Sequence, residues 1–169
     1  GLQLEMQTAY PYQEEIVFRI QQASRRKKLN LAFRIPSWAK EYQIHVNDKP
    51  LTTQLEKNYL VVQREWRKGD VIRLTLPMAL RMEKAQGSQN VAAILRGPMV
   101  LAADLGGSDQ AFDGIAPALV GQNILSAFSS IQSSAAHYQS KGIGRPHDLQ
   151  FKPFYAQYTR RSAVYFSIY

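Results

Sequence analysis

Residues 29–38 read Leu-Asn-Leu-Ala-Phe-Arg-Ile-Pro-Ser-Trp, and their alternation indicates the fold class. Every second residue from Leu29 to Ile35 is a large apolar residue, and these side chains fall on one side of an extended chain. This two-residue period predicts a β-strand with one buried face. Pro36 ends the strand because proline has no N–H to donate to a sheet, and Trp38 follows as an apolar side chain at a corner.

The same kind of pattern recurs along the first two thirds of the chain. We expect short strands at 2–9, 14–21, 29–35, 43–47, 59–64, 71–76, 91–95 and 99–103, with an edge-like extension around Leu80 and Met82. None of these segments has a sustained helical period. Short strands spaced about ten residues apart predict an all-β protein, namely an antiparallel β-sandwich of jelly-roll-like type.

Two connections carry turn residues. We expect residues 65–70 to form a tight hairpin between the strands at 59–64 and 71–76, because the Lys-Gly-Asp tip supplies a glycine. Arg96-Gly97-Pro98 interrupts an apolar run and predicts a bulge or kink, because glycine permits unusual dihedral angles and proline removes a donor.

The pattern changes after residue 105. We therefore expect a β-sandwich domain at 1–105 and a loop-rich linker or excursion at 106–148, in which 118–121 could add a strand. Residues 149–169 regain aromatic strand patterns. These C-terminal strands either pack on the sandwich or form a small second β unit.

The net charge of +8 does not predict a nucleic-acid partner. The only dense basic run, residues 25–28, lies between two expected strands, and the other basic residues are dispersed. No apolar run reaches the roughly 18 residues that span a bilayer, so no membrane partner is expected.

The start of the chain has neither an initiator methionine nor a signal-peptide pattern. We interpret the chain as a piece cut from a longer protein. Its compartment therefore stays open, with an exported or periplasmic bacterial protein as one alternative.

A search for catalytic groups finds no constellation. The chain has no cysteine, which excludes thiolate ligands and cysteine nucleophiles. His45, His137 and His147 lack metal-ligand spacing, and Glu14-Glu15 is the only adjacent carboxylate pair, whose members point to opposite faces of a strand. We expect no catalytic residue, no metal and no cofactor.

Four aromatic residues are candidates for carbohydrate binding. Trp38, Trp66, Tyr10 and Tyr12 all lie at turns, where exposed rings stack on sugars. The alternative for both tryptophans is that they close the ends of the sandwich core.

Several short motifs occur in a fixed order, and a further group lies near the C-terminus. They are Arg34–Ala39, Val46–Asn47, Trp66–Asp70, Leu76–Met78 and Arg96–Val100, then Pro153–Tyr155, Arg161 and Val164–Phe166. This series resembles the region that follows the catalytic domain in the β-L-arabinofuranosidase family of glycoside hydrolases (family 127). The tail departs from the family pattern, since Tyr158 and Arg161-Ser162 stand where relatives tend to carry histidine and then Arg-Tyr.

The resemblance implies that catalysis takes place elsewhere. Members of that family place a cysteine nucleophile and a zinc site of cysteines and a glutamate in an N-terminal (α/α)6 barrel, and this chain matches none of those residues. The expected function is a non-catalytic accessory region that packs against the barrel and helps to shape the cleft for a plant-derived carbohydrate. The alternative is an autonomous carbohydrate-binding module. We also expect the isolated fragment to self-associate through an apolar face.

Overall fold

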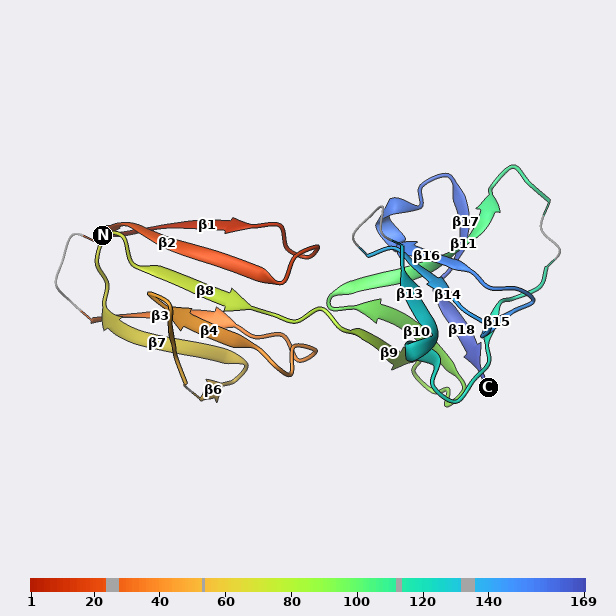
Figure 1. Cartoon of the computed structure of the whole chain (residues 1–169), viewed down its shortest axis with the longest axis horizontal. Helices are drawn as coiled ribbons and strands as arrows, with labels where there is room; N and C mark the ends of the chain where they lie inside the picture. The colour runs from red at the N-terminus through yellow and green to blue at the C-terminus, as the bar shows by residue number, and fades with distance from the viewer. Residues whose placement is uncertain (24–27, 53, 112–113, 132–135) are drawn as a thin grey trace. The chain divides into compact units, whose positions relative to one another are not determined.

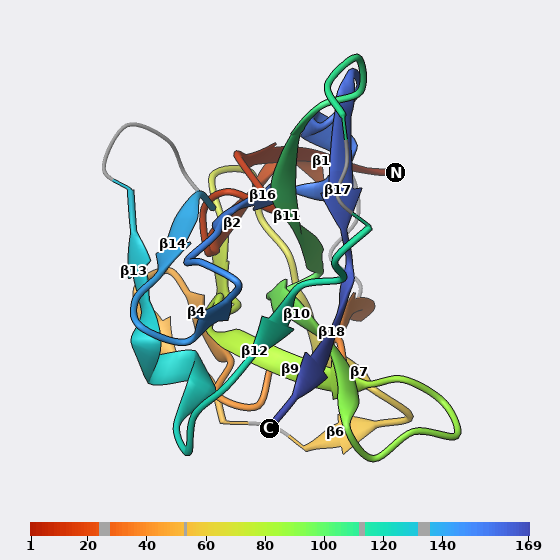
Figure 2. The same cartoon turned by 90° about the vertical axis from the view of Figure 1, so that its right-hand side faces the viewer.

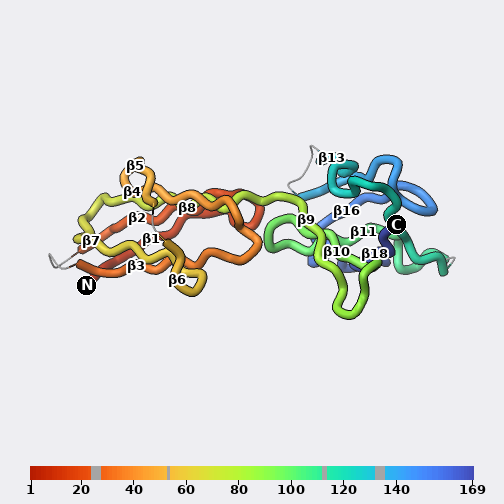
Figure 3. Tube along the Cα trace, turned by 90° about the horizontal axis from the view of Figure 1, so that it is seen from below, coloured from red at the N-terminus to blue at the C-terminus, as the bar shows by residue number. Residues whose placement is uncertain are grey.

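The computed structural model of the chain describes residues 1–23, 28–52, 54–111, 114–131 and 136–169. The chain divides into two compact units, Gly1–Met78 and Ala79–Tyr169 (Figure 1). Figure 3 follows the chain as it leaves the last strand of the first unit and enters the first strand of the second. Arg25, Arg26 and Lys27 of the basic run lie outside the described residues.

The first unit consists of two sheets. Its strands are β1 (Leu2–Thr8), β2 (Glu15–Ala23), β3 (Lys28–Arg34), β4 (Gln43–Val46), β5 (Lys49–Pro50), β6 (Leu55–Glu56), β7 (Tyr59–Glu65) and β8 (Val71–Thr75). One sheet has the order β1-β2-β8-β4-β5 and the other the order β3-β7-β6, with every pair antiparallel. The prediction of an all-β fold is confirmed.

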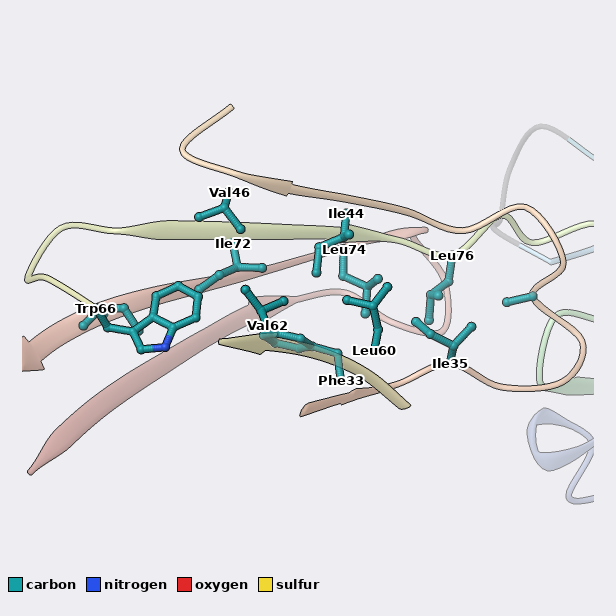
Figure 4. Packing of buried hydrophobic residues seen from close by; sticks show 12 residues of the cluster. Phe33, Ile35, Ile44, Val46, Leu60, Val62, Trp66, Ile72, Leu74 and Leu76 are labelled. Atoms are coloured by element: carbon teal, nitrogen blue, oxygen red, sulfur yellow. The ribbon is translucent and has the colours of Figure 1, made fainter. Parts of the chain in front are cut away.

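The core of the first unit lies between these two sheets. Alternate residues of β8, β7 and β3 supply it, as the two-residue period predicts. Figure 4 shows these side chains in one continuous cluster, with Trp66 at one end and Leu76 at the other. The buried members are Ile20, Phe33, Ile35, Ala39, Ile44, Val46, Leu60, Val62, Trp66, Ile72, Leu74 and Leu76.

The strand at 29–35 follows its predicted alternation, but its apolar face is buried unevenly. Phe33 and Ile35 are buried, Leu31 is partly buried, and Leu29 is exposed. The face is therefore covered at one end of the strand and open at the other.

The prediction of a hairpin at residues 65–70 is wrong. β7 belongs to the three-stranded sheet and β8 to the five-stranded sheet, so this segment crosses from one layer to the other. The crossing segment is also tied to β2, because the Gly69 N–H donates to the Ile20 carbonyl and the Ile20 N–H to the Asp70 carbonyl. Gly69 has a φ of 90°, which explains the need for glycine there.

The second unit is a mixed sheet with two 3-10 turns (Figure 2). Its elements are β9 (Leu80–Lys84), β10 (Val91–Arg96), β11 (Met99–Gly107), β12 (Ala118–Leu119), η1 (Ile124–Ala127), β13 (Phe128–Ser130), β14 (Tyr138–Ser140), β15 (Gly144–Arg145), β16 (Gln150–Pro153), η2 (Phe154–Ala156), β17 (Arg160–Ala163) and β18 (Tyr165–Ile168). β12 pairs with β18 in parallel, and the other described pairs are antiparallel.

The core of the second unit is built around three aromatic rings. Phe151 lies 4.9 Å from Phe128 and 5.3 Å from Phe166, measured between ring centroids. Ile94 and Leu101 of the central strands are fully buried beside them in the same cluster. This core shares no residue with the core of the first unit.

The prediction of a bulge or kink at Arg96-Gly97-Pro98 is also wrong, because these residues end one strand and form a hairpin turn. Arg96 pairs with Met99, which leaves Gly97 and Pro98 as a two-residue turn between β10 and β11. Gly97 adopts a φ of 50°, as a tight hairpin requires of its first central residue. The Arg81 guanidinium donates to the Gly97 carbonyl at 3.1 and 3.2 Å and fixes the turn against β9.

The units divide at Met78/Ala79, whereas the change in sequence pattern predicts a first domain that ends at residue 105. The physical reason is strand pairing: β10 pairs with β18, and β11 pairs with β16 and β17. Residues 79–105 therefore pair with the C-terminal aromatic strands. The segment expected to be loop-rich, 106–148, contains β12, β13, β14 and β15. No described helix is long and apolar enough to cross a membrane.

Candidate functional site

Two of the motif segments meet at one end of the first unit. Asp70 Oδ1 accepts a hydrogen bond of 2.8 Å from Asn47 Nδ2, and Asp70 Oδ2 accepts one of 2.8 Å from the Arg67 backbone N–H. Asn47 Oδ1 in turn accepts from the Val71 N–H at 2.9 Å. This arrangement, which we call the Asn47–Asp70 clasp, joins the turn after β4 to the segment that crosses between the sheets.

The carboxylate of the clasp is ionised over a wide pH range. Burial raises the pKa of Asp70, but the hydrogen bonds from Asn47 and Arg67 and the charges of Arg64 and Arg67 outweigh it, so its pKa lies below the usual 3.8. Arg64 Nη2 lies 3.6 Å from Asp70 Oδ2. A carboxyl group whose pKa is lowered in this way is a poor general acid at neutral pH.

Trp66 is a core residue. Its side chain is only 3% exposed, and its indole N–H donates to the Leu29 carbonyl at 3.0 Å. The Arg64 guanidinium lies 5.2 Å from the ring centroid, within cation–π range. No ring face is left for a sugar, and the burial of Trp66 fits the alternative of a tryptophan that closes one end of the core.

The other three aromatic candidates occupy different environments. Trp38 and Tyr10 are partly buried and pack against the core of the first unit. Burial raises the pKa of Tyr10, an effect that the Arg34 charge partly offsets. Tyr12 is exposed. The four aromatic residues thus do not form one exposed platform, because Trp66 is buried.

The adjacent carboxylates Glu14 and Glu15 serve the fold. Glu14 Oε1 accepts a hydrogen bond of 2.8 Å from the Met78 N–H, and its carbonyl accepts one of 2.9 Å from the Leu76 N–H. Glu15 and Asp48 both lie near Arg73, at 3.6 and 3.3 Å. These contacts hold strand ends together.

Two aspartates have comparable roles in the second unit. Asp104 accepts from Lys152 Nζ at 3.1 Å and from Arg160 Nε at 2.6 Å. Burial raises the pKa of Asp104, but these two cations and the Gly106 N–H bring it below its usual value. Asp148 receives the N–H groups of Gly142 and Gly144 and the hydroxyl of Ser140, which lower its pKa.

These lowered pKa values predict a loss of stability in acid. A carboxylate whose pKa is lower in the folded state stabilises the fold above its unfolded pKa, and this stabilisation is lost as the pH falls through the folded pKa. For Asp70 and Asp104 the unfolded value is near 3.8, so the melting temperature should decline as the pH falls below about 4. Circular dichroism melts from pH 3 to 7 measure this decline. Asp70→Asn should flatten it for the first unit, and an unchanged acid slope in that variant would contradict this role of Asp70.

Among the described residues, one open cavity of moderate size lies in the first unit and another lies in the second. The cavity beside β4, of about 300 Å³, is lined by Tyr42 and His45, with no carboxylate among its described lining residues. The cavity beside β11, of about 390 Å³, contains Asp104 and His147. Asp104 is already bonded to the cationic side chains of Lys152 and Arg160. Neither cavity therefore holds a pair of carboxylates suited to cleaving a glycosidic bond.

The residues present do not fit the family's zinc site. That site requires cysteines, and the chain has none. Within the described ranges, no three histidine, aspartate or glutamate side chains gather in a way that could hold a metal ion.

Sequence reasoning missed one surface feature of the second unit. Phe154, Tyr155 and Tyr158, on and just after η2, are all exposed, Tyr158 by 90%. Their motif was visible in the sequence as Pro-Phe-Tyr, but the aromatic pattern predicted a strand in which alternate rings would be buried. The strand in this region, β16, ends at Pro153, and the 3-10 turn η2 that follows it has no buried residue.

Comparison with known proteins gives a match for the first unit. Residues 1–78 match the family model described as Beta-L-arabinofuranosidase, GH127 middle domain. The match ends at Met78, where the first compact unit also ends. None of the curated proteins compared with the sequence matches it.

Solved structures match over nearly the whole chain. A GH127 beta-arabinofuranosidase is 21% identical with a TM-score of 0.72, and the match covers 99% of this chain and 32% of that one. A second solved chain, named glycoside hydrolase, gives 22% identity, a TM-score of 0.72 and the same shares. A GH127 beta-L-arabinofuranosidase from Geobacillus stearothermophilus T6 gives 17%, a TM-score of 0.73, and shares of 99% and 31%.

The chain therefore spans about a third of the length of these solved proteins, and both of its units have the fold of the corresponding region. For residues 79–169 the likeness concerns the fold alone. Residues 1–78 of this chain are similar in sequence to the GH127 β-L-arabinofuranosidase middle domain.

Proposed function

We propose that this chain is the non-catalytic accessory region of a longer GH127-type glycoside hydrolase, which we call the full-length enzyme. The observation that carries the proposal is the family match, which covers the whole first unit and describes it as a middle domain. A middle domain has other parts of the polypeptide on both sides. The shares of 31–32% of the solved chains support the same conclusion.

The state of the polar side chains supports a structural role. The motif residues Asn47 and Asp70 bind each other, and Trp66 lies in the core. Asp104 and Asp148 are each held by several donors. A catalytic acid requires a carboxyl group whose pKa is raised toward neutrality, whereas the pKa values of these three aspartates are lowered.

In the full-length enzyme, the accessory region packs against the catalytic barrel and forms part of the wall of the carbohydrate cleft. Its own contribution to the reaction is to stabilise the barrel and to keep the cleft in shape. Neither task requires a reactive group on this chain.

Deletion in the full-length enzyme tests this role. Removing residues 1–169 should expose the apolar surface on which they pack, so the remaining protein should lose several degrees of melting temperature and most of its hydrolysis of aryl β-L-arabinofuranosides. Removing only residues 79–169, from the boundary between the two units onward, is the matched control. This deletion should lower the melting temperature and the hydrolysis activity by less. A remaining protein that keeps both its melting temperature and its kcat/KM would contradict the proposed role.

A further inference from the structure

Three exposed apolar residues of the first unit lie on the side of their strands that faces the core. Leu4 is 40% exposed, Met6 60% and Leu29 42%. In the register of β1 and β2, Leu4 lies opposite Ile20 and Met6 lies opposite Phe18. Opposed residues of an antiparallel pair point to the same side of the sheet, and Ile20 is a buried core residue. We call Leu4, Met6 and Leu29 the open core edge.

Burial rises steadily from this edge into the core. Met6 is 60% exposed, its partner Phe18 is partly buried, and Phe33 of the other sheet is 6% exposed. The rings of Phe18 and Phe33 lie 5.0 Å apart, so these residues form one row through both layers. Among the described residues, the row ends at Met6, which is 60% exposed.

The β3 strand shows the same gradient along its own length. Leu29, Leu31 and Phe33 share one face by alternation, and they pass from exposed to partly buried to buried. The core of the first unit is therefore left uncovered at the margin formed by β1 and the first residues of β3.

The strand at this margin has few of the features that protect exposed sheet edges, and the one irregularity in its pairing with β2 is a register shift between Gln3 and Leu4. β1 is an end strand of its sheet, and β2 is its partner among the described strands (Figure 1). It contains no lysine and no proline, and Glu5, its only charged residue, accepts a hydrogen bond from Gln21 of β2. Natural edge strands usually carry such protection, and its scarcity is typical of an edge that is covered in the complete protein.

We propose that the open core edge is covered by a segment of the same polypeptide that lies outside residues 1–169. This inference rests on the proposed function. The matched family is a middle domain and the chain spans about a third of its solved relatives, so two thirds of such an enzyme lie outside it. A segment on the same polypeptide also has a high effective concentration at β1, which a separate partner lacks.

Hydrogen exchange tests the proposal on the full-length enzyme and on residues 1–169 side by side. The amides of β1 should exchange about tenfold or more slowly in the full-length enzyme, because covering the edge removes its local opening. Amides of β8, which is flanked on both sides in its sheet, serve as the internal control and should differ little. Equal exchange of β1 in both proteins would overturn the proposal.

Substitutions give a second readout. The double variant Leu4→Ser, Met6→Ser should lower the melting temperature of the full-length enzyme by several degrees and that of residues 1–169 by less, because only the former loses a packed interface. Tyr59→Ser is the control, since Tyr59 is 42% exposed, close to the 40% of Leu4, but alternates with the core residue Leu60 and so lies on the outer face of its sheet. Equal effects of the double variant on both proteins would count against the proposal.

Two further outcomes would show either that a second copy of the chain covers the edge or that the proposed function is wrong. If residues 1–169 form a dimer in sedimentation velocity, and the full-length enzyme forms the same dimer through β1, the occupant is a second copy and the proposal fails. If the full-length protein lacks a GH127 catalytic part, the proposed function fails, while the exchange of β1 still shows whether its edge is covered.

Discussion

Replacing Trp66 with alanine is expected to destabilise the first unit strongly. The side chain is 3% exposed and lies at one end of the core cluster (Figure 4), so its removal leaves a large cavity between the sheets. Tryptophan-to-alanine changes in a core cost about 3–5 kcal/mol. The substitution also removes the hydrogen bond to the Leu29 carbonyl and the contact with Arg64. A loss of this size is a large fraction of the roughly 5–15 kcal/mol that stabilises a typical domain.

Urea unfolding followed by circular dichroism and hydrogen exchange measures the effect on each unit. Trp66→Phe separates the two contributions, because it keeps an aromatic ring in the core and removes the N–H donor, and it should cost clearly less than the alanine variant. Trp38→Ala is the control for a partly buried tryptophan and should also cost less. If Trp66→Ala leaves the midpoint of the first unit unchanged, the burial described here is wrong.

Gly144→Ala is expected to destabilise the second unit strongly. A Cβ atom at Gly144 would lie 2.3 Å from the His147 carbonyl oxygen and 2.7 Å from Asp148 Cα, both of which are backbone atoms. Relieving the clash would move Asp148 away from the N–H groups that its carboxylate binds. Overpacking usually costs about 1–3 kcal/mol, and the loss of these hydrogen bonds adds to that cost.

Gly142→Ala is the matched control in the same loop. Gly142 has a φ of 76°, so alanine is strained there, but a Cβ atom would meet no neighbour within 4 Å. The strain of a left-handed residue alone costs about 1–2 kcal/mol. Thermal unfolding of the two variants should therefore show the larger loss for Gly144→Ala. Equal losses of stability would mean that the backbone around Asp148 shifts at little energetic cost, and they would contradict the prediction.

The elements of the fold could be predicted because alternation is a local signal. The strands at 2–8, 15–23 and 71–75 lie close to where the two-residue period places them, and the strand at 91–96 lies where a near-continuous apolar run predicts it. The sheet to which each strand belongs is not encoded by a local signal. The segment from Trp66 to Asp70 has the composition of a hairpin tip, yet β7 and β8 pair with different neighbours. The composition of a segment predicts a turn, but it does not predict whether the two strands that the turn joins pair with each other.

The strands missed between residues 106 and 148 had weak patterns. β13 reads Phe-Ser-Ser and β14 reads Tyr-Gln-Ser, so each has a single large apolar residue. Ser140 is nevertheless buried, because its hydroxyl bonds with Asp148 and with the Leu149 N–H. Burial by hydrogen bonding leaves no hydrophobic signal in a sequence.

The motifs were recognised from the sequence, but their roles were not. Asn47 and Asp70 are 23 residues apart and meet only in the folded unit. The exposure of Leu4, Met6 and Leu29 was also hidden, because alternation indicates the side of a strand but not whether another layer covers it. Both features depend on tertiary structure.

Turnover tests the central claim most directly, namely that this chain belongs to a glycoside hydrolase whose chemistry lies elsewhere on the polypeptide. The measurement compares arabinose release from an aryl β-L-arabinofuranoside by equal concentrations of residues 1–169 and of the full-length enzyme. We expect the full-length enzyme to turn over and residues 1–169 to release no more arabinose than buffer. Turnover by residues 1–169 that a single substitution such as Asp104→Asn abolishes, without unfolding the chain, would contradict the claim.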